Sequence, residues 1–313
     1  MVKKLIATAA LALATTCMAA PQASAADNGI QAFRDAYMPA MSQEHHYRAD
    51  FMFNGPTFHS NANTYWTLKP NGQAEMNGKF VWDYTDLNTK KTSKYEIPIY
   101  GSSDGASFDI YGKSATRWES ETVFAGLTGL LNALQTGDQN IKEKIAAAVK
   151  RVKVSDVGTD NCRMDIKFDG KALAALEKEI VTGRLASMPD GEKAAATANM
   201  GYVATSLEEE DLNVIWTVNK KTGETVTLAA DLTNFMRGYA KAILEDSYKG
   251  KITLTPKDTE SLASIGYYYN LQCYINSDKK ANMEIAVPAD LKKDVRTNNL
   301  FEYIRDEVVS VVK

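Results

Sequence analysis

The feature that most constrains this chain is an alternation of apolar and polar residues over three consecutive segments, residues 47–53, 58–68 and 74–84. Side chains alternate between the two faces of a β-strand, so this period of two predicts strands that each have one apolar face. Asn-Gly-Pro-Thr and Lys-Pro-Asn-Gly separate the segments, and both are typical turn sequences. The segments therefore predict an antiparallel meander that buries one face.

Pairing residues across the turns predicts a register for the meander. Pairing Phe53 with Phe58 across the first turn fixes the first two strands, and Phe51 then lies opposite Ser60. Pairing across the second turn in the same way places Ser60 opposite Trp82. Large side chains then face small ones across the sheet, as a curved inner face requires.

The rest of the chain predicts further strands and helices around this meander. Strands are expected at residues 94–100, 106–112, 115–120, 160–168, 212–219, 224–233, 250–255, 265–276 and 281–287. Helices are expected at residues 28–43, 122–135, 139–151, 171–185, 235–244 and 298–312. The polar, Ala-rich residues 188–206 predict a loose helix or a loop.

These elements predict an α+β fold, a large curved antiparallel sheet (an incomplete β-barrel) wrapped around apolar helices. Strands occur on both sides of the central helices, which favours one sheet of about 10–12 strands. No linker rich in Gly, Ser or Pro divides the chain. We therefore expect a single domain over residues 26–313, with a helical insert at about 122–206.

The first 25 residues have the pattern of a secretory signal peptide. Lys3 and Lys4 precede an apolar stretch at residues 5–14, and Ala23-Ser24-Ala25 is a small-x-small cleavage site. Cleavage after Ala25 predicts a periplasmic or secreted protein. No later stretch has the roughly 18 apolar residues of a membrane-spanning helix.

Two cysteines, Cys162 and Cys273, follow the predicted cleavage site, and each lies on the apolar side of an alternating segment. In an oxidising compartment, one possibility is a disulfide between two such thiols. The alternative is two buried free thiols, because free cysteine is among the most buried residue types. The sequence leaves both possibilities open.

No residue pattern predicts catalysis, a metal site or nucleic-acid binding. Residues 101–105, Gly-Ser-Ser-Asp-Gly, match the G-x-S-x-G motif, but a strand is expected after them and no histidine follows His59. His59 lies too far from His46 along the predicted hairpin to share a metal, and the adjacent His45 and His46 point to opposite faces of the strand. A formal net charge of −3 provides no basic excess for nucleic acid. We therefore expect no enzyme activity, metal or cofactor.

The order of helix, meander, apolar helices and second meander resembles the LolA-like fold of periplasmic lipoprotein carriers and related lipid-binding bacterial lipoproteins. Residues 215–224, Ile-Trp-Thr-Val-Asn-Lys-Lys-Thr-Gly-Glu, are similar to a hairpin of that group with Asp-Lys-Lys-Thr-Gly at its turn. Residues 282–288, Asn-Met-Glu-Ile-Ala-Val-Pro, are similar to its closing strand. In that group an incomplete antiparallel barrel curls around helices and encloses a cavity for acyl chains. The resemblance implies a lipid or an acylated protein as the partner.

The inward faces of the predicted strands supply candidate ligand contacts. The expected wall consists of Phe51, Phe53, Trp66, Phe80, Trp82 and Leu228. The helix at 122–135 would act as a plug or lid through Leu127, Leu130, Leu131 and Leu134. Core packing explains the same residues, so the alternative is a structural or interaction module of the cell envelope with a filled core. The sequence predicts no oligomeric state.

Overall fold

The computed structural model describes residues 29–38, 44–54, 58–70, 73–86, 88–103, 108–114, 117–123, 138–186, 190–248, 255, 270–277, 285, 287–291, 295–296 and 300. The first meander contains β1 (His45–Asn54), β2 (Phe58–Leu68), β3 (Ala74–Thr85), β4 (Thr92–Ser103), β5 (Phe108–Lys113) and β6 (Trp118–Val123). The remaining strands are β7 (Val149–Val157), β8 (Asn161–Phe168), β9 (Leu212–Asn219), β10 (Thr225–Asp231), β11 (Asn270–Ser277) and β12 (Val295–Arg296). The helices are α2 (Gly29–Tyr37), α4 (Gln139–Ala147), α5 (Gly170–Leu185), α6 (Asp190–Glu209) and α7 (Thr233–Tyr248).

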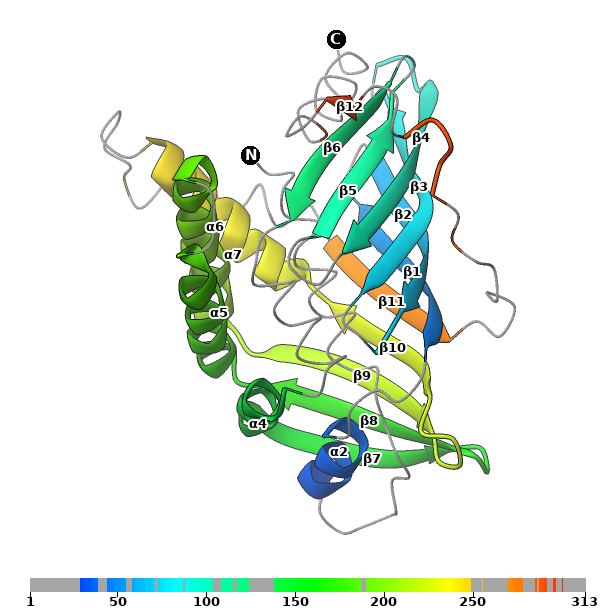
Figure 1. Ribbon diagram of the computed structural model, residues 1–313, viewed down its shortest axis with the longest axis vertical. Helices are drawn as coiled ribbons and strands as arrows, with labels where there is room; N and C mark the ends of the chain where they lie inside the picture. Colours follow the sequence, from blue (N-terminus) through cyan, green and yellow to red (C-terminus); the bar gives the residue numbers. More distant parts are fainter. Residues whose placement is uncertain are drawn as a thin grey trace.

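The twelve strands of the described residues form one sheet in the order β12-β6-β5-β4-β3-β2-β1-β11-β10-β9-β8-β7. Every pairing is antiparallel except that of β12 with β6. Strand β11 joins the two meanders, because it pairs with β1 on one side and β10 on the other (Figure 1). The α+β class and the expected size of the sheet are therefore confirmed.

The two hairpins of the first meander differ in how well the sequence predicted their register. Across the second turn, Ser60 pairs with Trp82, as expected. Across the first turn the prediction was wrong by two residues, because Phe51 pairs with Ala62 and not with Ser60. A shift by two keeps every side chain on its own face, so the apolar pattern does not distinguish these two registers.

One face of the sheet is apolar in both meanders, and the described helices contact the sheet at β7 and β11. Near β7, helix α2 inserts Phe33, whose ring meets those of Phe168 and Trp216 edge to face at 6.0 Å between centroids. Helix α5 packs on α6 and α6 on α7, while α7 contacts β11. These three helices stand beside the sheet as a separate layer (Figure 1). Within the described part of the chain, no helix is both long and apolar enough to cross a membrane.

A buried lysine connects α4 to α2. Lys142 is fully buried, and its Nζ donates hydrogen bonds to the carbonyl oxygens of Tyr37 and Met38, at 3.2 Å each. A cation near these carbonyls complements the negative end of the α2 dipole. Burial lowers the pKa of Lys142 to about 8. Lys142 therefore closes the C-terminal end of α2 against α4.

Three sequence-based assignments change in the structure. Helix α4 ends at Ala147, and residues 149–157 form the edge strand β7, which the sequence reading missed. A bulge between Val149 and Arg151 interrupts the alternation of β7. Residues 190–209 form the continuous helix α6, where a loose helix or loop was expected, and residues 122–123 belong to β6. The signal peptide, most of helix 122–135, most of the strand at 250–255, most of the strand at 281–287 and nearly all of helix 298–312 lie outside the described residues.

The close approach of β2 and β3 depends on Gly78, which lies opposite Thr64. A Cβ at this position would overlap the carbonyl oxygen of Asn63 in the neighbouring backbone. We expect Gly78→Ala to lower the free energy of unfolding by about 2 kcal/mol or more, because the backbone must shift. Gly183→Ala is the control, since its Cβ would meet open space on α5. The control should stabilise the helix by up to about 1 kcal/mol. Urea unfolding measures the free energy of unfolding of both variants. Equal changes in the two variants would contradict the close approach of β2 and β3.

Candidate functional site

The candidate site is the apolar surface between the inner face of the sheet and helices α5 to α7. Helix α5 contributes one face with Leu173, Leu176 and Ile180 at helical spacing. Leu176 belongs to the main buried cluster, and Leu173 and Ile180 pack against it while partly exposed. Val203 of α6 and Phe235 of α7 are partly buried against the same cluster. Half-buried apolar groups thus come from all three helices.

The inner face of the sheet contains the residues that the sequence singled out. Phe51, Trp66 and Leu228 are 6%, 4% and 2% exposed and belong to the same buried cluster. Trp82 is 2% exposed, and its ring contacts those of Tyr95 and Phe80, each 5.3 Å away between centroids. The expected wall residues with described side chains therefore all lie on the inner face. The side chain of Phe53 and the residues Leu127, Leu130, Leu131 and Leu134 lie outside what the structure describes.

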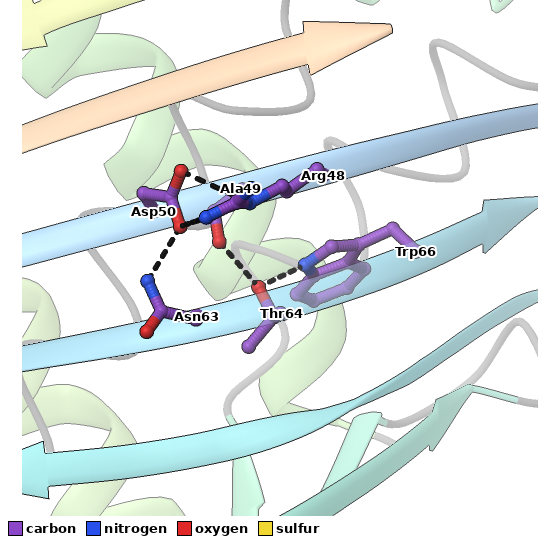
Figure 2. A network of polar contacts seen from close by, with 6 residues as sticks. All are labelled: Arg48, Ala49, Asp50, Asn63, Thr64 and Trp66. Carbon is purple, nitrogen blue, oxygen red and sulfur yellow. Dashed lines mark hydrogen bonds and ion pairs between the residues drawn. The ribbon is translucent and has the colours of Figure 1, made fainter. Parts of the chain in front are cut away.

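Polar groups inside the wall are paired where β1 meets β2. Trp66 donates its indole N–H to Thr64 Oγ1 at 2.8 Å, and Thr64 in turn donates to the carbonyl oxygen of Ala49 at 3.0 Å (Figure 2). On the opposite face, Asn63 donates to Asp50 at 2.6 Å. A buried donor without an acceptor costs free energy, so this network allows the indole to sit in an apolar wall.

A carboxyl group lies on the apolar face of α5. Glu177 shares that face with Leu173 and Ile180, and burial raises the pKa of its carboxyl to about 7. No hydrogen bond or ion pair joins this carboxyl to another described residue. The sequence reading missed Glu177, although a glutamate within the period of apolar residues on an amphipathic helix is a visible signal.

The two cysteines are not brought together by the strand order. Cys162 lies in β8 and Cys273 in β11, with β9 and β10 between them. Three strand spacings amount to about 14 Å, whereas a disulfide tolerates a Cα separation of up to about 7 Å. Cys162 is a buried free thiol. Of the two alternatives, the structure thus has the free thiol at Cys162.

Two of the histidines make side-chain contacts with neighbouring residues. His46 contacts Thr67 and Glu44, at 3.1 and 3.0 Å, and His59 contacts Asn54 at 3.1 Å. Among the described residues there is no group of three or more His, Cys, Asp or Glu side chains that could hold a metal ion.

Two hollows on the surface differ in chemistry from the inner face. One, of about 270 Å³, lies on the outer face of β7 to β10, and another, of about 260 Å³, lies where α6, β9 and α7 meet. Asn213 and Asp231 line both hollows. The first is also lined by the charged residues Arg151, Asp165 and Lys167, and the second by Glu210, Asp211 and Arg237. Near them, Lys150 and Lys167 hold the pKa of the Asp211 carboxyl down at about 2. Charged side chains in both linings thus distinguish these hollows from the inner face of the sheet.

Comparisons with known proteins give a structural resemblance. No family model matches the chain. No curated protein matches it in sequence. A solved structure that it resembles is LprF from Mycobacterium bovis, with 11% sequence identity, a TM-score of 0.33, and coverage of 78% of this chain and 90% of that chain. The α+β assignment itself rests on the strand order and helices described above.

The raised pKa of Glu177 predicts a pH dependence of stability. Its carboxyl ordinarily titrates near 4.5 and in the folded state near 7, so between these values the folded state binds more protons. Stability should therefore fall as the pH rises from 4.5 to 7. Partial solvation keeps the effect below about 1.4 kcal/mol per pKa unit.

Urea unfolding of Glu177→Gln between pH 4 and 8 measures this contribution, and the variant should lose that part of the slope. Glu179→Gln removes the same charge at an exposed position of the same helix and serves as the control. An unchanged slope in Glu177→Gln would show that the carboxyl is solvated.

Proposed function

We propose that this is an exported, non-catalytic protein that binds an apolar ligand, a lipid or an acylated protein, between its sheet and its helix layer. The observation that supports the proposal is the presence of partly exposed apolar side chains on both layers. Ala62 and Ile99 belong to the sheet, and Ile180, Val203 and Phe235 to the helices. Ligand sites for apolar molecules are lined mainly by such groups.

Export is part of the proposal and rests on the first 25 residues. Their order of basic, apolar and small residues is that of a cleaved signal peptide. A periplasmic or secreted location would bring the protein to the compartment where acyl chains of envelope lipids need shielding from water.

A second candidate is a structural or interaction module of the envelope with a filled core. The specific observation in its favour is the low exposure of Phe51, Trp66, Trp82 and Leu228, none above 6%. Side chains so well covered contribute to stability through burial alone. The two candidates differ in whether an apolar molecule enters this region.

Native mass spectrometry of residues 26–313 purified from the exporting cell distinguishes the candidates. The proposal predicts a lipid at near-stoichiometric amount, identified after solvent extraction. A protein that carries no lipid and binds no fluorescent acyl probe would favour the filled-core module.

A charge introduced into the helix layer should weaken binding. Val203 of α6 is partly buried against the core cluster, so Val203→Lys places an ammonium group beside the proposed ligand. Because an unpaired charge is costly in an apolar environment, we expect affinity for an acyl probe to fall at least about tenfold. Ala198→Lys, on the exposed side of the same helix, should leave affinity unchanged. Circular dichroism confirms that each variant is folded, and equal affinities would place the ligand elsewhere.

A further inference from the structure

The four tryptophans of this chain differ in how their indole N–H groups are satisfied. Trp66 donates to Thr64 at 2.8 Å, Trp216 to Thr225 at 3.0 Å, and Trp118 to Asp290 at 3.1 Å. The indole nitrogen of Trp82 is buried and has no hydrogen-bond partner among the described residues. Trp82 is thus the exception among side chains of the same kind.

The strand sequences explain why Trp66 and Trp82 differ. Thr64 precedes Trp66 by two positions and therefore lies on the same face of β2, within reach of the indole. Phe80 holds the equivalent position before Trp82 in β3 and has no acceptor. A buried donor normally finds an acceptor, and a donor left without one calls for a specific explanation.

The ring of Trp82 is held in place while its N–H is left unpaired. Tyr95 stacks on it with an interplanar angle of 15°, and Phe80 contacts it at 37°. Across the β2–β3 ladder Trp82 faces Ser60, so it lies on the inner face that contains the proposed ligand contacts. A rigid indole with a free donor in an apolar wall is suited to orient one polar atom of an apolar molecule.

We propose that the indole N–H of Trp82 donates a hydrogen bond to an oxygen atom of the bound ligand. The ligand is then an acyl compound with an ester or carboxyl oxygen, and not a plain hydrocarbon. This inference rests on the proposed function, because it assigns one polar contact within the same site. The ester and the carboxylate share the acceptor chemistry, and the experiment separates them.

The test uses three pyrene-labelled probes of equal chain length: an alkane, a fatty acid methyl ester and the free fatty acid. The wild-type protein should bind the ester or the acid about five- to tenfold more tightly than the alkane, the range that one hydrogen bond supplies. Trp82→Phe should remove this preference and keep the affinity for the alkane. Tighter binding of the ester than of the acid would identify an ester oxygen as the acceptor. Tighter binding of the acid would identify a carboxylate oxygen.

Trp118→Phe is the matched control, since its N–H already donates to Asp290 within the protein and Trp118 is not among the expected wall residues. It should keep the preference for oxygen-bearing probes even if its stability falls. The indole N–H resonances of the wild-type protein give a readout that needs no variant to fold. The resonance assigned to Trp82 should move downfield when the ester is added and stay in place when the alkane is added.

The outcomes separate this inference from the proposed function. If the wild-type protein binds the probes but shows no preference, or if Trp82→Phe keeps the preference, the inference is wrong and the function stands. A Trp82 indole N–H resonance that does not move when the ester is added leads to the same conclusion. If the wild-type protein binds none of the three probes, the proposed function and the inference both fail.

Discussion

The architecture depends on the pairing of β11 with β1 and with β10. Ala49, Ile275 and Leu228 lie opposite one another across these three strands, and this register places the apolar faces of both meanders on the same side. A shift of one residue would turn the apolar face of one meander toward solvent. The apolar surface of the two meanders is therefore continuous, and the described helices contact the sheet at β7 and β11.

The alternation of residues was sufficient to predict the meanders, because it reports directly which face is buried. It was insufficient for the hairpin between β1 and β2, where two registers differ by an even number of residues and expose the same faces. It also failed for β7, an edge strand with Lys150, Arg151 and Lys153. Charged residues protect an edge from pairing with other chains, and here they also weaken the apolar pattern.

The candidate site was predictable in composition but not in its polar details. Phe51, Trp66, Trp82 and Leu228 were expected on the inner face from their strand positions, and they lie there. The acceptor of each indole depends on which hydroxyl or carboxylate lies nearby in three dimensions. Thr64 is near Trp66 in sequence, whereas Trp118 finds Asp290 more than half of the chain away. The separation of Cys162 from Cys273 likewise required the strand order.

The position of β11 in the chain has a consequence for how the protein folds. Tyr47 pairs with Ser277, so β1 gains its second neighbour from a strand that is synthesised long after it. Until that strand arrives, β1 and β10 each have an edge of unpaired N–H and C=O groups, which other chains can pair with. Pairings between distant segments form slowly, because loop closure precedes the contacts that compensate for it. The period between synthesis of the first meander and insertion of β11 is therefore when the chain is most prone to aggregate and most dependent on chaperones.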